Sequence, residues 1–264
     1  MADEQRDTPE NLYKYQAINL RRVDWTSRIF SHNEIYFASP AEFNDPFDCR
    51  ADAVRIRGSK DAWRRYLREL LRKQHPGWSR KEVRWEAASL VKKGVHRDPK
   101  RIQAVYAEWQ KDIDQLGIYC LSETRDDILM WSHYSAGHAG YCLEFSVRPG
   151  APIFADALPV TYRDSRPNID YFRATNIAKF EAALLTKATA WEYEKEWRLI
   201  ETQGGPGVRK FDPSLLTGVV LGARMRGAQR QRLLAFASTS ASQPAVYEAV
   251  VSRDRYKLDV RRIV

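Results

Sequence analysis

The segment 191–198 holds the residues whose types and spacing most suggest chemistry. It reads Trp-Glu-Tyr-Glu-Lys-Glu-Trp-Arg. If this segment is a β-strand, then Glu194, Glu196 and Arg198 share one face, because successive side chains of a strand point to opposite sides. Such a face is either an exposed edge with a solvated ion pair or a carboxylate that an arginine orients inside a cleft. In the second case Glu196, which is nearer to Arg198, would be the catalytic carboxylate and Glu194 would support it.

A second motif, at residues 130–134, reads Met-Trp-Ser-His-Tyr and predicts a short helix that ends at Gly137. On a helix, Trp131 and Tyr134 are neighbours, while His133 points elsewhere. We therefore consider Trp131 and Tyr134 as candidates for stacking on a planar ring. His133 is a candidate base, acid or hydrogen-bond donor. The alternative is an aromatic core helix with a structural histidine.

A third motif, at residues 43–48, reads Phe-Asn-Asp-Pro-Phe-Asp and places two carboxylates and an amide among aromatic rings. Pro46 favours an extended conformation for Asp45. The motif is either an Asx-turn that caps the preceding strand or a rigid loop that presents Asn44 and Asp45 to a ligand.

Two predicted strands carry weaker candidates. Residues 13–15 place a lysine between two tyrosines, and residues 121–123 end a strand with a hydroxyl and an acid. A solvated lysine is the simpler explanation of the first pattern. The candidate ligand-binding residues of these strands are Tyr13, Lys14, Tyr15 and Ser122.

Alternating strand and helix patterns would position these motifs. A strand at 12–18, a helix capped by Asn19 and a strand at 34–38 form one compact unit. Further strands are predicted at 117–121, 141–145, 160–162, 197–200, 216–221, 246–251 and 257–260, and helices at 126–134, 176–187 and 228–236. We therefore predict one α+β domain, residues 1–264, with a mixed or split β-sheet core and flanking helices.

Three amphipathic helices within residues 59–116 interrupt this pattern, and we interpret them as a basic helical insertion at about 58–116. The segment 55–114 contains 17 Lys or Arg and 8 Asp or Glu, so it holds the whole formal net charge of +9. Either these helix faces are simply solvated, or they bind nucleic acid. In the second case the binding residues would be Arg64, Arg65, Arg68 and Arg72.

Composition narrows the class of protein. Hydrophobic residues make up 44% of the 264 residues, which is enough for a sizeable core. No stretch approaches the ~18 apolar residues of a membrane helix, and the N-terminus has no secretory signal, so we expect a cytoplasmic protein without membrane contact. The three cysteines do not form a disulfide framework or a zinc site. No Gly-rich phosphate loop or dinucleotide fingerprint is present.

The order of the motifs resembles that of the bacterial family called domain of unknown function 2971. Between Leu12 and Ile200 the chain contains, in order, LYKY, IYFASPAEFNDPFDC, GIYCLSE, ILMWSHYSAGHAGYCLEF, VTYRD and LLTKATAWEYEKEWRLI. The resemblance implies a bacterial protein in a phage-defence or toxin context, and it implies no particular activity.

A more distant resemblance is to ADP-ribosyltransferases, which use NAD. In those folds a strand with a polar or aromatic residue is followed by a helix, a strand that ends in Tyr or Ser, and a late strand with a glutamate. Residues 13–15, residues 36–39 and then Glu194 or Glu196 occur here in that order, with Lys14 in place of His or Arg. The resemblance implies NAD as the bound nucleotide, Ser39 as a binding residue and Glu196 as the residue that stabilises an oxocarbenium-like ribose.

The leading hypothesis is a nucleotide-handling enzyme that transfers ADP-ribose from NAD, with Arg198 and Lys14 holding phosphates. It requires the motifs to converge on one pocket. The alternative enzyme is a metal-dependent nuclease that uses Asp45, Asp48, Glu144 and Glu196. A third, non-enzymatic possibility is a nucleic-acid-binding or regulatory module that uses its basic helices.

Overall fold

The computed structural model describes residues 8–18, 23–53, 56, 58–150, 153–167 and 169–264. Its contacts divide the chain into two compact units. The first unit comprises Met1–Glu42, Leu116–Tyr162 and Thr189–Val264, and the second comprises Phe43–Gln115 and Arg163–Ala188. The second unit therefore contains nearly all of the predicted helical insertion and two further stretches of the chain.

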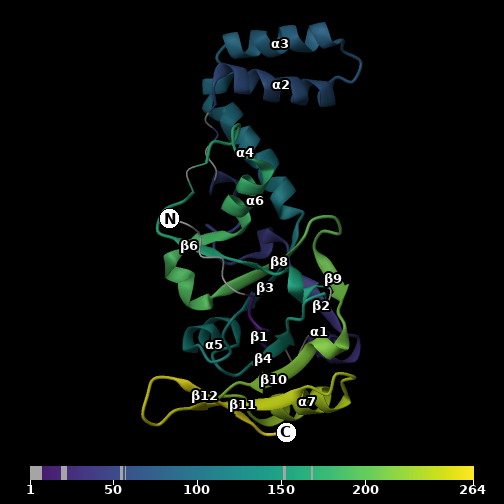
Figure 1. The fold of residues 1–264 in the computed structure, drawn as a ribbon, viewed down its shortest axis with the longest axis vertical. Helices are drawn as coiled ribbons and strands as arrows, with labels where there is room; N and C mark the ends of the chain where they lie inside the picture. Colours follow the sequence, from purple (N-terminus) through teal and green to yellow (C-terminus); the bar gives the residue numbers. More distant parts are fainter. Residues whose placement is uncertain (1–7, 19–22, 54–55, 57, 151–152, 168) are drawn as a thin grey trace. The chain divides into compact units, whose positions relative to one another are not determined.

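An eight-stranded mixed sheet is the centre of the first unit (Figure 1). Its strand order is β12-β11-β10-β4-β1-β3-β8-β5, and all neighbours are antiparallel except β10 and β11. The α+β class and the mixed sheet are thus as the sequence predicts. The strands are β1 (Asn11–Gln16), β3 (Gly117–Ser122), β4 (Tyr141–Ser146), β5 (Leu158–Pro159), β8 (Glu196–Glu201), β10 (Leu216–Leu221), β11 (Ala245–Val251) and β12 (Leu258–Arg262).

One face of this sheet is apolar and packs against helices α1 (Val23–Ser31) and α7 (Gly227–Thr239). The hydrophobic cluster joins Phe30 of α1 and Leu233 of α7 to Leu143 of β4, and all three side chains are buried. A small sheet pairs β2 (Glu34–Phe37) with β9 (Gly207–Lys210), and Ile35 and Phe37 of β2 belong to the same cluster. Strand β9 was not predicted, because its sequence contains a single apolar residue, valine.

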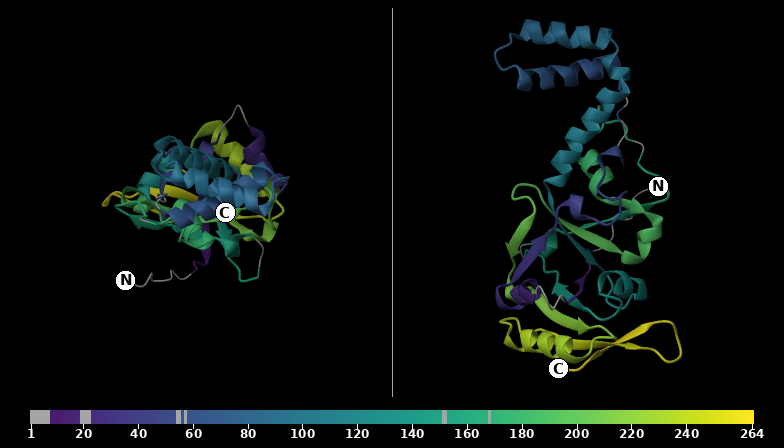
Figure 2. Two further views of the ribbon diagram at one scale, coloured as in Figure 1. Left: turned by 90° about the horizontal axis from the view of Figure 1, so that it is seen from above. Right: turned by 180° about the vertical axis from the view of Figure 1, so that it is seen from behind.

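Three helices of the second unit, α2 (Lys60–Gln74), α3 (Arg80–Lys92) and α4 (Pro99–Asp114), confirm the predicted helical block. Helices α2 and α3 lie side by side and antiparallel (Figures 1 and 2). The predicted capping box is present, since the Glu82 N–H donates to Ser79 Oγ at 3.2 Å and the Ser79 N–H to Glu82 Oε2 at 2.7 Å. The core beneath these helices includes Trp63, Leu67, Leu71, Val83, Ala87 and Val91.

The other elements differ from prediction mainly at their ends. Helix α5 (Ile128–Tyr134) begins two residues late, where the Asp127 carboxylate caps it. Helix α6 (Asn176–Leu184) ends early, and the chain continues as β7 (Thr186–Ala188). The predicted cap Asn19 lies outside the described residues. The remaining elements are β6 (Thr161–Arg163) and the 3-10 helices η1 (Pro40–Glu42), η2 (Ala51–Ala53), η3 (Val95–Arg97), η4 (Phe154–Asp156), η5 (Thr189–Glu194) and η6 (Pro213–Leu215).

Within the part of the chain that the structure describes, every helix is too short or too polar to cross a membrane.

Tyr119 of β3 carries a hydroxyl into the apolar core. Its side chain is buried, and its hydroxyl has no hydrogen-bond partner among the described residues. Burial also raises the pKa of this hydroxyl well above its ordinary value. A buried polar group without a partner costs about 1–3 kcal/mol. We therefore expect Tyr119→Phe to raise the free energy of unfolding, by about 1 kcal/mol in urea denaturation.

Tyr141→Phe is the matched control, because the buried Tyr141 hydroxyl donates to Gln16 Oε1 at 2.6 Å. Its removal should lower the free energy of unfolding by about 1 kcal/mol. Two substitutions that destabilise equally would show that the Tyr119 hydroxyl contributes as much as a paired one.

Candidate functional site

Four strands of the first unit place polar side chains in one row, on the face of the sheet opposite the apolar core. The strand pairs align Glu144 with Tyr13, Tyr13 with Ser122, and Ser122 with Glu196. Paired residues of neighbouring strands project to the same side of a sheet. We call these four residues the polar row. It brings together three predicted site residues, Tyr13, Ser122 and Glu196, that are far apart in the sequence.

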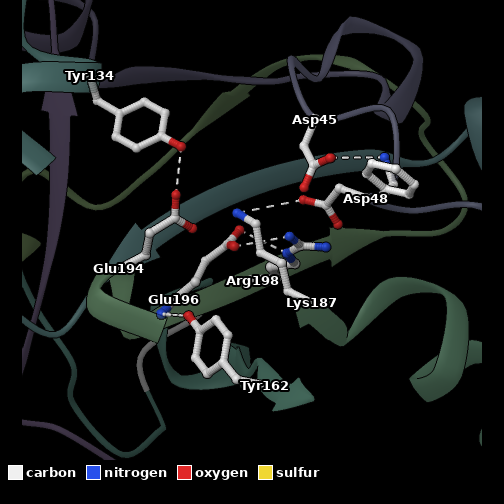
Figure 3. Close-up of polar contacts among 9 residues, drawn as sticks. Asp45, Asp48, Tyr134, Tyr162, Lys187, Glu194, Glu196 and Arg198 are labelled. Atoms are coloured by element: carbon white, nitrogen blue, oxygen red, sulfur yellow. Dashed lines mark hydrogen bonds and ion pairs between the residues drawn. The ribbon is translucent and has the colours of Figure 1, made fainter. Parts of the chain in front are cut away.

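Glu196 and Arg198 form a buried ion pair at the start of β8 (Figure 3). The Arg198 Nε donates to Glu196 Oε1 at 2.8 Å, and Nη2 donates to Oε2 at 2.9 Å. The two residues are 4% and 0% exposed. Two parallel N–H···O bonds fix both the place and the orientation of the carboxylate. The two residues do share a strand face, and the alternative of an exposed edge strand is wrong.

Glu194 is not on β8, contrary to prediction. It ends η5, and Lys195 after it has a φ of 43°, a left-handed conformation that turns the chain before the strand begins. The buried Glu194 carboxylate accepts from the Tyr134 hydroxyl at 2.5 Å (Figure 3). The Glu194 carbonyl accepts from the Ser122 hydroxyl at 2.6 Å. Contacts with α5 and β3 therefore hold Glu194 beside the polar row.

Three rings form an aromatic group at the surface of the first unit: His133 of α5, and Trp191 and Tyr193 of η5. The His133 ring centroid lies 6.5 Å from that of Trp191 and 6.3 Å from that of Tyr193, and the last two are 6.1 Å apart. His133 is exposed and the other two are half-buried. The neighbouring Tyr134 hydroxyl reaches Glu194, so the aromatic group adjoins a buried carboxylate.

Trp131 and Tyr15 are structural, which corrects the expectation that they contact a ligand. Trp131 is 0% exposed, and its Nε1–H donates to the Arg125 carbonyl at 2.9 Å. Its ring packs edge-on against the ring of the buried Tyr15, and the two ring centroids are 5.2 Å apart. The Tyr15 hydroxyl donates to the Thr124 carbonyl at 2.8 Å. One side of α5 is thus an aromatic core, as the alternative interpretation stated.

Lys14 lies on the opposite face of the sheet from Arg198, because its strand neighbours Tyr13 and Tyr15 occupy the face of the polar row. Its Nζ donates to the Cys120 carbonyl at 2.8 Å and lies 4.7 Å from the centroid of the Tyr119 ring. Lys14 and Arg198 therefore do not face one site, which contradicts the expectation that they hold phosphates together in one pocket.

Glu144, at the other end of the polar row, belongs to a second ion pair. Its Oε2 lies 2.7 Å from Arg125 Nη1, and its Oε1 accepts from the Thr217 hydroxyl at 3.0 Å. The pKa of Tyr13 is raised to about 12, mainly by burial and to a smaller extent by the charge of Glu144. Among the described residues no group of three or more His, Cys, Asp or Glu side chains is placed to hold a metal ion. Since arginines engage both Glu144 and Glu196, the geometry does not favour the two-metal hypothesis.

The cysteines are free thiols. Burial raises the pKa of Cys120 and of Cys142, so both stay protonated near neutral pH. Protonated, buried thiols do not act as nucleophiles.

Ser39 has a local role. Its hydroxyl accepts from the Ala41 N–H at 3.2 Å, and its own N–H donates to Glu42 Oε1 at 2.9 Å, so it caps η1. The residue before it, Ala38, bridges to Ile118, near the opposite end of β3 from the polar row.

The second unit holds the polar residues of the 43–48 motif. Asp45 Oδ1 accepts from the Phe47 N–H at 2.9 Å, which is the Asx-turn that the sequence predicts as one alternative. Asp48 Oδ2 lies 3.7 Å from Lys187 Nζ, and both side chains are buried (Figure 3). Asn44 is exposed. The structure thus gathers Asp45, Asp48 and Lys187 within the second unit.

The four arginines proposed to bind nucleic acid all lie on α2. Arg65 and Arg72 are exposed, whereas Arg64 pairs with Asp61 at 2.6 Å and Arg68 donates to the Arg64 carbonyl at 3.1 Å. Local contacts therefore engage two of the four.

Comparison with known families adds one finding. Residues 130–199 match a family model. Its description is "Protein of unknown function (DUF2971)". The match spans α5 to β8 and so includes His133, Glu194, Glu196 and Arg198, whereas the motifs before Met130 lie outside it. Searches of curated proteins and of solved structures found no match.

Three residues of the site were not predicted: Tyr162, Trp191 and Tyr193. The Tyr162 hydroxyl accepts from the Glu196 N–H at 2.7 Å and so anchors the start of β8 (Figure 3). All three occur within the motifs that carry the family resemblance. The signal that could have found the last two is a pair of aromatic residues that alternate with glutamates just before the predicted strand.

Proposed function

We propose that the first unit binds NAD and transfers ADP-ribose from it, as an ADP-ribosyltransferase-like enzyme. The observation that carries the proposal is the Glu196–Arg198 ion pair, a carboxylate fixed by two hydrogen bonds at the start of a strand. It follows directly after the segment that supplies Trp191 and Tyr193. A phage-defence context rests on the family resemblance alone.

The chemistry that suits this carboxylate is cleavage of a glycosidic C–N bond. Nicotinamide leaves with the bonding electrons, and positive charge develops on the ribose carbon that the acceptor then attacks. The fixed negative charge of Glu196 stabilises that positive charge, and Arg198 keeps the carboxylate oriented and favours its ionised form. His133, which is exposed on α5, would take the proton that the acceptor loses.

The aromatic group would bind the planar ring of NAD. Aromatic side chains stack with flat heterocycles and hold them at low entropic cost because the rings are rigid. Tyr134 connects this surface to Glu194 through its hydroxyl, so a ring that binds there would lie near the Glu194 carboxylate.

Trp191→Ala tests NAD binding. Loss of one stacking ring costs about 1–3 kcal/mol, so we expect the Kd for NAD to rise about 10-fold or more in isothermal titration. Trp85→Ala is the matched control, because Trp85 is 70% exposed on α3 in the second unit and should leave the Kd unchanged. Equal affinity in the wild type and in Trp191→Ala would show that the aromatic group does not bind NAD.

A second candidate function, nucleic-acid binding by residues 55–114, is favoured by one observation. Trp85 and Trp78 are 70% and 40% exposed next to basic residues of α3, and exposed aromatic rings among cations are typical of single-strand binding. The exposed arginines Arg65 and Arg72 lie on the neighbouring α2.

We expect Arg65→Glu with Arg72→Glu to weaken binding of a single-stranded oligonucleotide at least about 10-fold at low salt. The slope of log K against log salt should fall by about 1–2, since two phosphate contacts are lost. The control variant, Arg253→Glu with Arg255→Glu, changes the net charge equally at exposed positions of the first unit. Equal losses in the two variants would show an effect of net charge and would exclude the α2 surface.

A further inference from the structure

A pocket of about 320 Å³ lies entirely within the second unit. The 43–48 loop, residues 163–167, the end of α6 and β7 line it. Small-molecule sites usually have volumes of about 300–1,000 Å³, so this pocket suits a ligand of modest size. None of the residues of the proposed function lines this pocket.

Asp45 places a buried carboxylate in the wall of this pocket. The residue is 9% exposed, and among the described residues the Phe47 N–H is the single hydrogen-bond donor to its side chain, at Oδ1. The other carboxylate oxygen, Oδ2, can accept hydrogen bonds from a ligand that enters the pocket.

Exposed aromatic and basic side chains line the mouth of the pocket. Phe47 is 67% exposed, an unusual state for a large apolar ring, so part of its ring is open to a planar group. Arg163 and Arg166 line the same pocket and are exposed, and Arg166 Nη1 lies 2.8 Å from Asp52 Oδ2. The Arg166 guanidinium lies 5.4 Å from the centroid of the Phe47 ring. The mouth thus combines an aromatic face with cations that suit an anionic group.

We propose that this pocket binds a ribonucleoside phosphate. The ribose hydroxyls donate to Asp45, as an acidic side chain receives ribose hydroxyls in dinucleotide-binding folds. The base stacks on Phe47, and the phosphate contacts Arg163 and Arg166. A simple amine would satisfy Asp45, but it would leave the arginines and the aromatic face unused.

The test measures binding of AMP and of 2′,3′-dideoxy-AMP to the full chain by isothermal titration. Asp45→Asn keeps the oxygen that accepts from Phe47 N–H and removes the charge. We expect it to raise the Kd for AMP about 10-fold or more. Electrostatics alone predicts the opposite, because removal of a negative charge should strengthen binding of an anion. Asp112→Asn, at an exposed position of α4 in the same unit and outside the pocket lining, is the control and should change the Kd less than about 2-fold.

Dideoxy-AMP should bind the wild type about 10-fold more weakly than AMP, and Asp45→Asn should not weaken it further. The comparison of AMP with dideoxy-AMP on the wild type remains a test even if Asp45→Asn does not fold. Equal affinity of the wild type for AMP and dideoxy-AMP would overturn the proposal, as would AMP binding that Trp191→Ala abolishes and Asp45→Asn does not change. The last result would place the nucleotide at the aromatic group, so it separates this inference from the proposed function.

Discussion

Arg198→Met is expected to lower the free energy of unfolding by about 3–5 kcal/mol. The Glu196 carboxylate is 4% exposed and receives two hydrogen bonds from this guanidinium. Removal of one partner of a buried ion pair is strongly destabilising, because the cost of burying the other charge is no longer offset. Urea denaturation of the purified variant measures the effect.

Two further variants make the result specific. The double variant Arg198→Met with Glu196→Gln should recover much of the loss, since no buried charge is left at either position. Lys257→Met breaks a surface pair with Asp259 whose side chains are 51% and 32% exposed, and it should cost less than about 1 kcal/mol. If Arg198→Met costs no more than Lys257→Met, the buried pair does not stabilise this part of the fold.

Glu196→Gln is expected to reduce release of nicotinamide from NAD by about 100- to 1,000-fold. The substitution keeps the shape of the side chain and removes the charge that would stabilise the cationic transition state. Nicotinamide is followed by chromatography at saturating NAD, so that a change in kcat is separated from a change in binding.

Glu192→Gln and Glu194→Gln are the comparisons for this result. Glu192 is exposed in η5, and its replacement should leave the rate unchanged. Glu194 supports the site through Tyr134, so its replacement should cost less than that of Glu196. A larger loss in Glu194→Gln than in Glu196→Gln would reverse the roles of the two carboxylates.

Local patterns predicted the parts of the fold that local chemistry determines. The capping box of Ser79 and Glu82 marks the start of α3, and it does so through hydrogen bonds within four residues. The alternation of β8 likewise places Glu196 beside Arg198. In each case the sequence pattern and the contact that it predicts lie in the same short segment, so the local sequence is sufficient to predict the contact.

Other features depend on contacts that a short pattern does not contain. Glu194 leaves the strand because Lys195, which is not a glycine, adopts a left-handed conformation. Lys14 faces away from Arg198 because the register of β1 against β3 sets its side, and that register is a long-range property. The burial of Trp131 against Tyr15 similarly joins α5 to a strand that precedes it by more than a hundred residues.

The most direct test of the proposed function is release of nicotinamide by the wild-type chain when it is incubated with NAD and candidate protein or nucleic-acid acceptors. We predict release that depends on the acceptor, with ADP-ribose joined to that acceptor and with little release by Glu196→Gln. Equal release by the wild type and Glu196→Gln would contradict the role of this carboxylate. Absence of release from either protein, together with metal-stimulated cleavage of nucleic acid, would contradict the proposed function and support a nuclease.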